Sequence, residues 1–359
     1  KNNILKHLSL CYKKHNMRKK DLSVLKLKDL NLNKKILPIY SNFKTQLEKN
    51  IKKNTFLVAV SGGPDSLALS ALSQQYIIEK KNKAYFVLIN HNIRANSSKE
   101  AEAVKNLLKK KGINLIILKN LKKIDKNIQS NARNIRYRLL LDFSIKKKIK
   151  FITTGHHRDD QIETFLIRLS RGSGIQGLSA MNKITNLNRR VKLFRPLLNE
   201  NKKELSYIAN FFFGKVFKDP SNFNKKYLRT RIRGLIVQLE KCGIKSEQII
   251  SSINNLAAAR DTLNDYIQKV EQSCLIIKKK NIVINLEKFF PEKKDIQLKI
   301  ISNCLKTISN NYYPPRAKKV LNFISRIKTE KKLKSTLGGC LVFRNHKNLI
   351  ISKELSKKT

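Results

Sequence analysis

A glycine turn directly behind an apolar run limits the fold of this chain more than any other stretch. The residues Phe56-Leu-Val-Ala-Val60 read as a buried strand, and the polar sequence Ser61-Gly-Gly-Pro-Asp-Ser66 follows at once. A helical pattern begins near Ser66. Glycines let backbone N–H groups approach a polyphosphate, and a helix N-terminus favours negative charge. The stretch therefore predicts a strand, a phosphate-binding turn and a helix.

This turn carries no lysine. The common phosphate-binding loop GxxxxGK[ST] has a lysine after its glycines, whereas Pro64 and Asp65 stand there in this chain. We expect backbone amides, hydroxyls and magnesium to meet the phosphate instead. The alternative is an ordinary strand-to-helix turn, because Gly, Pro, Asp and Ser are turn residues. The complete SGGPDS sequence after an apolar strand favours nucleotide binding.

Apolar runs and helical patterns alternate from residue 54 onward. Strands are predicted over 56–60, 84–89, 115–118 and 151–154, and helices over 66–80, 97–111, 132–147 and 159–170. The runs are continuously apolar, as in a parallel sheet that is covered on both faces. The alternation predicts a doubly wound α/β domain with right-handed crossovers.

Three polar clusters each follow a predicted strand. They are residues 61–66 after Val60, Asn90-His-Asn-Ile-Arg94 after Ile89, and Gly155-His-His-Arg-Asp-Asp160 after Thr154. Segments that leave the carboxyl ends of parallel strands line one crevice, where ligands bind. We therefore expect the clusters to meet at one edge of the sheet, with a nucleotide among them.

The alternation fades after residue 174. The sequence predicts a helix over 202–213, a mostly helical stretch over about 235–327, and a terminal hairpin from 340–343 and 349–352. We divide the chain into four parts: a basic N-terminal extension (1–50), a nucleotide-binding catalytic domain (51–233), a helical RNA-binding domain (234–328) and a reduced C-terminal region (329–359). Met17 could be the natural start, or the basic segment could be an organelle-targeting sequence.

The charge balance points to a polyanionic partner. The chain has 77 basic and 25 acidic residues, a net charge of +52. Abundant lysine would also be expected of an AT-rich genome, but thirteen of the eighteen arginines lie between Arg94 and Arg233. Arginine binds phosphate with two parallel hydrogen bonds, so this cluster favours nucleic acid. No uncharged apolar run is long enough to span a membrane, and no basic amphipathic helix has an aromatic face.

The cysteines indicate a reduced intracellular protein. All five are far apart in the sequence and form no CxxC pair: Cys11, Cys242, Cys274, Cys304 and Cys340. They predict neither a zinc site nor a disulfide framework.

Residues 56–233 resemble a known family. SGGPDS is similar to the PP-loop of the ATP pyrophosphatases, and the full set of motifs resembles the tRNA(Ile)-lysidine synthases within that group. The further motifs, in the family's order, are NHNIR (90–94), Asn131-Ala-Arg-Asn-Ile-Arg-Tyr137, GHHRDDQIET (155–164), RGSGIQGLSAM (171–181), RPLL (195–198), DPSN (219–222) and YLRTRIR (227–233).

The resemblance implies an enzyme that modifies the minor isoleucine tRNA with a CAU anticodon. ATP would adenylate the 2-carbonyl oxygen of the wobble cytidine and release pyrophosphate. The amine of free lysine would then displace AMP to leave lysidine, which changes codon reading from AUG to AUA. Charge that develops at the α-phosphate needs magnesium and oriented donors more than covalent help.

The family's motifs assign roles to residues of this chain. The residues assigned to ATP binding are Ser61, Gly62, Gly63, Pro64, Asp65, Ser66, His91 and Arg94. The candidate catalytic residues are Asp65, His156, Asp160 and Glu163, with Asp65 and Asp160 as candidate Mg²⁺ ligands.

Asp160 and Glu163 are three apart on one helix face, and the pair is assigned to magnesium or to the ammonium of lysine. The alternative is a carboxylate at a helix start and a solvated charge. His156 or His157 could contact a phosphate or move a proton.

Seven arginines are candidate tRNA contacts: Arg133, Arg136, Arg171, Arg195, Arg229, Arg231 and Arg233. Arg133, Arg136 and Arg171 could equally bind the phosphates of ATP. Contacts with the RNA backbone add affinity and salt dependence without reading sequence. A single arginine is more often a surface ion pair, so only the group supports this assignment.

Two features depart from the family. Asn90 stands where the family often has aspartate, so any role of an acid at that position is absent. The C-terminal half is shorter than in long family members, and Ser335-Thr-Leu-Gly-Gly339 with its following hairpin looks like a reduced C-terminal domain.

Other functions remain as alternatives. A PP-loop tRNA cytidine thiolase would commonly need paired cysteines, which the chain lacks. A non-catalytic RNA-binding module would not need to retain Asp65, Asp160 and Glu163. The resemblance further implies a cytoplasmic enzyme of a bacterial or organellar genetic system, with a homodimer as an open alternative.

Overall fold

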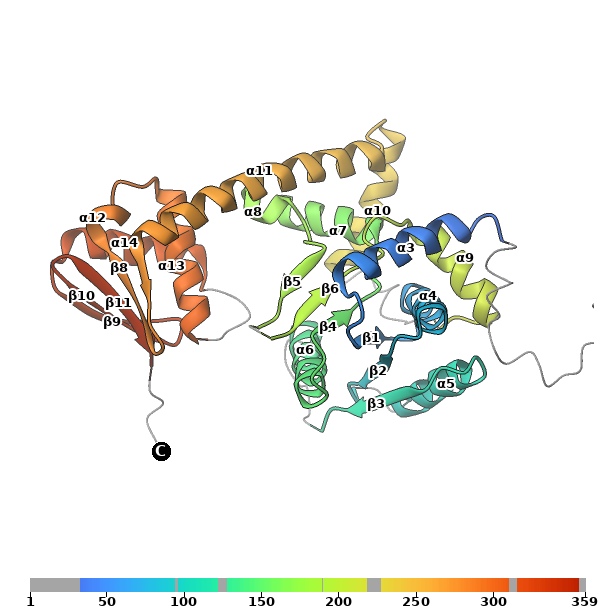
Figure 1. Cartoon of the computed structure of the whole chain (residues 1–359). Coiled ribbons are helices and arrows are strands. Elements are labelled where there is room, and N and C mark those ends of the chain that lie inside the picture. Colours follow the sequence, from blue (N-terminus) through green and yellow to red (C-terminus); the bar gives the residue numbers. More distant parts are fainter. Residues whose placement is uncertain are drawn as a thin grey trace, which may run out of the picture. The chain divides into compact units, whose positions relative to one another are not determined.

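The four predicted strands form one parallel sheet, which two further strands extend. The predicted strands are β1 (Phe56–Val60), β2 (Ala84–Asn90), β3 (Leu115–Lys119) and β4 (Phe151–Thr153). The additional strands are β5 (Ile184–Asn186) and β6 (Lys192–Phe194), and the order is β3-β2-β1-β4-β6-β5. Only β5 runs antiparallel to its neighbour. The doubly wound parallel sheet is thus confirmed (Figure 1).

The computed structural model describes residues 33–93, 96–121, 128–188, 190–217, 227–309 and 315–354. The chain forms two compact units. The first comprises Lys1–Gly172 and Ala180–Ile250, and the second comprises Ser173–Ser179 and Ser251–Thr359. The first unit contains the whole six-stranded sheet, and therefore all three polar clusters.

Helices cover both faces of the first sheet. On one face lie α4 (Pro64–Lys80) and α5 (Ser97–Lys109), and on the other lies α6 (Ile128–Lys146) (Figure 1). Outside α4 pack α3 (Leu37–Asn50) and α9 (Lys202–Phe213). The helix α4 carries no charge between Ser66 and Tyr76, as suits a helix that is buried on nearly all sides.

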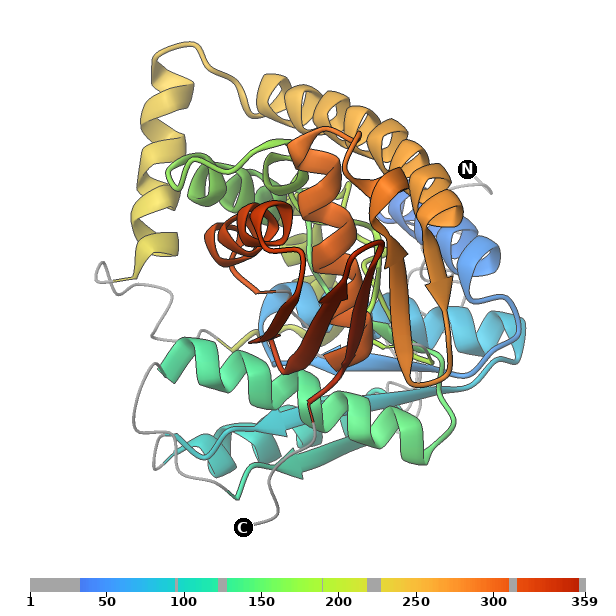
Figure 2. The same cartoon turned by 90° about the vertical axis from the view of Figure 1, so that its left-hand side faces the viewer.

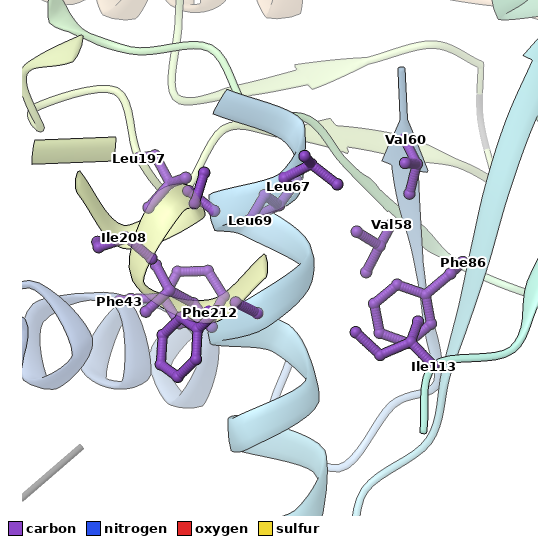
Figure 3. Packing of buried hydrophobic residues seen from close by; sticks show 14 of the residues in the cluster. Phe43, Val58, Val60, Leu67, Leu69, Phe86, Ile113, Leu197, Ile208 and Phe212 are labelled. Carbon is purple, nitrogen blue, oxygen red and sulfur yellow. The ribbon is translucent and has the colours of Figure 1, made fainter. Parts of the chain in front are cut away.

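The main core of the first unit has two layers, one on each side of α4. Val58 of β1 and Phe86 of β2 lie between the sheet and α4, whereas Ile208 and Phe212 of α9 lie beyond it with Phe43 of α3 (Figure 3). Full burial of such a side chain contributes roughly 1.5–3 kcal/mol. This packing fixes α4, and with it the turn at its N-terminus, against the sheet.

The second unit is built on an antiparallel sheet of five strands. They are β7 (Leu275–Ile277), β8 (Asn281–Asn285), β9 (Leu333–Leu337), β10 (Cys340–Asn345) and β11 (Asn348–Lys353), in the order β7-β8-β11-β10-β9. The orange and red strands lie side by side in Figure 2. The predicted terminal hairpin is β10 and β11, which pair over their full length.

Helices bury one face of this sheet. They are the end of α11 (Ser246–Cys274), α12 (Leu286–Phe289), α13 (Lys294–Ser309) and α14 (Ala317–Thr329). The expectation of a mostly helical stretch over 235–327 missed β7 and β8. In β8 the alternation of Ile282 and Ile284 with half-buried residues is the strand signal, and this strand joins the predicted hairpin in one sheet.

The strand β7 lies at an edge of this sheet. Its side chains Ile276 and Ile277 are 59% and 69% exposed, and three lysines follow directly at 278–280. An exposed apolar edge strand is a template for pairing with another chain. None of the helices in the described residues is long and apolar enough to cross a bilayer.

Candidate active site

The turn after β1 can form only with glycine at position 62. Gly62 has φ +86°, and a Cβ there would stand 2.7 Å from Cγ2 of Val104 on α5. Its carbonyl oxygen accepts a hydrogen bond of 3.2 Å from the N–H of Phe217, in the segment that follows α9. The turn is therefore held from two sides by segments distant in the sequence.

Ser66 organises the turn from inside. Its Oγ donates to the carbonyl of Gly63 at 2.9 Å and accepts from the N–H and the hydroxyl of Ser61, both at 3.1 Å. Ser61 itself is exposed, and its hydroxyl donates to Ser66. The loop is thus shaped before any phosphate arrives.

The helix α4 begins directly at this turn. Gly63 is its extended N-cap residue, Pro64 occupies the first helical position and Asp65 lies in the first turn. Gly63, as a glycine, has no side chain to cap the N–H groups there. The N-terminus of α4 therefore presents backbone donors to an anion, as the sequence predicts.

The end of β4 approaches this helix start very closely. A Cβ at Gly155 would lie 2.7 Å from the carbonyl oxygen of Asp65 and 3.2 Å from the N–H nitrogen of Ser66. Only glycine leaves room for this approach. The first and third polar clusters therefore meet, as expected from their positions after β1 and β4.

Three acids surround one buried histidine at this meeting point. Nε2 of His157 lies 3.6 Å from a carboxylate oxygen of Asp65 and 3.6 Å from one of Asp160, and its Nδ1 lies 3.9 Å from Asp159. The N–H of His157 donates to Asp160 at 3.2 Å, at the start of α7 (Arg158–Leu169). The His157 side chain is 3% exposed.

The acids determine the charge of this histidine. Burial lowers the pKa of His157, but the contact with Asp65 and the negative charges of Asp160, Asp65 and Asp159 together raise it above its usual value of 6.5. His157 therefore lies between the two acids that the family's motifs assign to magnesium, and their negative charges favour its protonated form.

These two acids fit a magnesium ion that is shared with a substrate. Oδ1 of Asp65 is buried and has no hydrogen-bond partner within the part of the chain that the structure describes. In the same part, no three His, Cys, Asp or Glu side chains are grouped to hold a metal by themselves. Mg²⁺ usually takes one or two carboxylates and completes its shell with phosphates and water. Asp65 and Asp160 supply such a pair.

His156 has a different environment from its neighbour. Its Nδ1 lies 2.8 Å from the hydroxyl of Thr154. Burial and the nearby positive charges of Arg195, Arg133 and Arg229 lower the pKa of His156 well below 6.5, so its ring is neutral. Of the two histidines, His157 is therefore the one beside the acids, whereas the sequence alone favoured His156.

Glu163 lies one turn further along α7 and is held by arginines. Its side chain is 3% exposed, and Nε of Arg233 donates to Oε1 at 2.5 Å. Nε of Arg229 lies 3.7 Å from Oε2. Both arginines belong to α10 (Leu228–Lys241), so the pairs connect α10 to α7. Sequence spacing correctly puts the two arginines on one helix face, but it does not reveal Glu163 as their partner.

The second polar cluster leaves the carboxyl end of β2, beside β1. Asn90 shapes this exit, because its Oδ1 accepts from the N–H of Asn92 at 2.9 Å and its Nδ2 donates to Ser98 at 3.0 Å. Both ring nitrogens of His91 are buried and lack a hydrogen-bond partner among the described residues. Burial and the charge of Arg136 lower the pKa of His91 to about 4, which leaves two polar atoms for a ligand. Arg94 lies outside the described residues.

The predicted tRNA contacts divide into buried and exposed arginines. Arg195 is 4% exposed, and its guanidinium donates to the carbonyl of Asn182 at 2.6 Å and the hydroxyl of Thr185 at 2.9 Å. This burial argues against a contact with RNA backbone and indicates that Arg195 ties β6 to β5. Arg136, Arg171, Arg229 and Arg231 are exposed, and the half-buried Arg133 lies over the ring of Tyr137 at 5.1 Å. The DPSN motif falls outside the described residues.

Comparison with known proteins places these features in a family context. Residues 35–240 match ATP_bind_3, a family of PP-loop domains. The tRNA(Ile)-lysidine synthase of Wolbachia pipientis wMel is 33% identical over 311 residues, which cover 85% of this chain and 72% of that protein. The enzyme of the same name from Orientia tsutsugamushi (strain Boryong) is 32% identical over 309 residues, 84% of this chain and 70% of its own.

A solved structure shares the fold. The U34-tRNA thiolase NcsA from Methanococcus maripaludis, with its [4Fe-4S] cluster, aligns with a TM-score of 0.54 and 22% identity. The alignment covers 62% of this chain and 78% of that one. At this identity the likeness supports the fold alone.

Proposed function

Since the chain belongs to the tRNA(Ile)-lysidine synthase family of PP-loop enzymes, we propose that it joins free lysine to the wobble cytidine of a CAU-anticodon isoleucine tRNA at the expense of ATP. The observation that carries this proposal is the meeting of the SGGPDS turn with the acids of α7 at one sheet edge. The enzyme would be a ligase that forms a carbon–nitrogen bond. It would act in the cytoplasm of a bacterium or in an organelle with its own genetic system.

The reaction has two steps. In the first, the 2-carbonyl oxygen of cytidine attacks the α-phosphorus of ATP, and the bond to the pyrophosphate oxygen breaks. In the second, an unprotonated amine of lysine attacks C2, the bond from C2 to the AMP oxygen breaks, and the nitrogen loses a proton. AMP and pyrophosphate leave as products. The protein must therefore bind polyphosphate, orient two nucleophiles in turn and accept a proton.

The turn supplies the polyphosphate site. The N–H groups at the start of α4 and the hydroxyls of Ser61 and Ser66 would bind pyrophosphate, in line with their arrangement around Gly63. Asp65 and Asp160 would hold Mg²⁺, which supplies positive charge to the phosphate oxygens. Protonation of His157, which the neighbouring carboxylates favour, would reduce the repulsion between Asp65 and Asp160 before the substrate binds.

The acid Glu163 is the candidate receiver of the lysine ammonium. It is buried, it lies on the same helix as Asp160, and its Oε2 has no hydrogen-bond partner among the described residues. A buried carboxylate favours a cationic partner strongly. Exposed arginines such as Arg171 and Arg231 would meet the RNA backbone.

A tRNA thiolase is the second candidate, because one shares the fold. Thiolation would require cysteines near the turn. In the described residues Cys274, Cys304 and Cys340 are buried in the second unit, and Cys242 is exposed at the end of α10. The sequence contains no CxxC pair, which favours ligation of lysine.

Transfer of labelled lysine tests the proposal. The full chain is incubated with ATP, Mg²⁺, labelled lysine and transcripts of the CAU isoleucine tRNA or of a methionine tRNA. Label should enter only the isoleucine transcript, and Asp65→Asn should abolish transfer. Asp142→Asn, at an exposed site on α6, is the matched control and should transfer at the wild-type rate. Incorporation of sulfur in place of lysine would overturn the proposal.

A further inference from the structure

The contact between a buried acid and two partly exposed arginines suggests a coupling device. The carboxylate of Glu163 is almost fully buried, whereas the side chains of Arg229 and Arg233 are 46% and 33% exposed. Each guanidinium has five N–H donors, and one carboxylate cannot occupy all of them. The arginines therefore reach from the protein surface to an acid inside the candidate active site.

Glu163 is also incompletely bonded. Arg233 donates to Oε1, but the Nε of Arg229, at 3.7 Å from Oε2, is beyond hydrogen-bond distance. Oε2 is buried and has no hydrogen-bond partner among the described residues. An unsatisfied buried acceptor is costly, so this oxygen is prepared for a further donor. An ammonium group would supply one.

We propose that Arg233 and Arg229 are exchangeable counter-ions. In the free enzyme they pair with Glu163, and when RNA binds they pair with its phosphates, so that the ammonium group of lysine can pair with Glu163 in their place. The proposal rests on the proposed function and adds a link between its two substrates. Without RNA, an arriving ammonium meets a carboxylate that is already neutralised, and the guanidinium of Arg233 repels it. With phosphate beside the exposed N–H groups, the arginines have another anion to pair with, and the acid needs a new cation.

The link must act in both directions. If RNA raises the affinity for lysine by some factor, lysine raises the affinity for RNA by the same factor. Such factors are typically about 5- to 150-fold. The device would restrict tight lysine binding to the enzyme that already holds its tRNA.

A simpler role for the ion pair is to fasten α10 to α7. The two roles make opposite predictions about lysine. If the ion pair only holds α10 against α7, loss of Arg233 should weaken lysine binding or leave it unchanged, and the effect should be the same with and without RNA. If the arginines exchange with lysine, loss of Arg233 should strengthen lysine binding in the absence of RNA. It should also remove most of the increase in lysine affinity that RNA causes.

Calorimetric titration of lysine into the full chain, with and without the isoleucine tRNA transcript, separates these roles. The wild type should bind lysine at least about 5-fold more tightly with RNA. Arg233→Gln should bind lysine without RNA nearly as tightly as the wild type does with it. Lys241→Gln, two turns further along α10 and exposed, is the matched control and should keep the wild-type ratio. Arg233→Lys keeps a cation on Glu163 and should retain part of the ratio, even if Arg233→Gln folds poorly.

Equal lysine affinity of the wild type with and without RNA would overturn the exchange mechanism. A parallel loss in Arg233→Gln under both conditions would overturn it as well. The lysine-transfer assay on the wild type keeps the two proposals apart. If lysine is transferred to the tRNA but RNA has no effect on lysine affinity, the coupling is refuted and the proposed function stands. If no lysine is transferred, both the proposed function and the coupling are refuted.

Discussion

Replacement of Gly155 by alanine should damage the candidate active site through backbone contact alone. The new Cβ would stand 2.7 Å from the carbonyl oxygen of Asp65, roughly 0.7 Å short of the 3.4 Å at which ordinary contact begins. The atoms that it meets are backbone atoms, which cannot rotate away as a side chain can. Either the end of β4 or the start of α4 must shift.

The size of the effect follows from two opposing contributions. Overpacking of this kind costs about 1–3 kcal/mol. Alanine in place of glycine recovers about 0.4–1 kcal/mol, because the unfolded chain loses freedom. We expect a net loss in the free energy of unfolding of about 1–2 kcal/mol. A displacement of this size at Asp65 should also weaken ATP binding and lower the adenylation rate, since about 1 Å of misplacement can cost about 100-fold in rate.

Urea unfolding followed by circular dichroism measures the first effect, and calorimetric titration with ATP measures the second. Gly234→Ala is the matched control, because Gly234 lies inside α10 and nothing is within 4 Å of a Cβ there. Its replacement should stabilise the helix by about 0.5–1 kcal/mol and leave ATP affinity unchanged. If Gly155→Ala unfolds at the wild-type urea concentration and binds ATP normally, the close approach of β4 to α4 does not position Asp65.

Four further outcomes are expected. Ser66→Ala should destabilise the protein by about 1–3 kcal/mol in urea titrations, because the N–H of Ser61 loses its acceptor, and an unchanged midpoint would contradict this role. The depressed pKa of His91 means that the folded protein loses stability as pH falls from 6.5 to about 4, and His91→Asn should lack this loss in unfolding titrations at pH 7 and 5. The raised pKa of His157 contributes stability that is fully present below pH 6.5 and is lost as pH rises through the pKa of the folded state. The difference in melting temperature between wild type and His157→Gln should therefore become smaller as pH rises. A difference that does not change with pH would argue against the contact between His157 and the acids. Arg195→Met should lower stability without altering the salt dependence of tRNA binding, whereas Arg231→Gln should reduce that salt slope by about 1.

The sequence predicts the central sheet well because its strands are continuously apolar. The runs at 56–60, 84–89, 115–118 and 151–154 all form strands of one sheet, whose order β3-β2-β1-β4 the sequence did not predict. The short strands β5 and β6 escaped prediction, since three residues give no period to recognise. Their formation depends on long-range contacts such as the hydrogen bonds from buried Arg195.

The location of the candidate site is predictable, whereas the orientation of its side chains is not. Topology brings the clusters after β1 and β4 together, and the contact between His157 and Asp65 agrees with that expectation. Neighbouring residues point in different directions, so the preference for His156 from the sequence did not identify His157 as the histidine beside the acids. The pairing of Glu163 with Arg233 joins residues seventy positions apart, and no local pattern signals it.

The three lysines behind β7 have a consequence for the behaviour of the protein at high concentration. Two copies that joined in parallel along this edge would bring the ammonium groups at 278–280 of one molecule close to those of the other. That repulsion opposes the gain from covering Ile276 and Ile277, and it does so most effectively at low salt. Neutralisation of these lysines should therefore lower the solubility of the protein, most clearly at low salt.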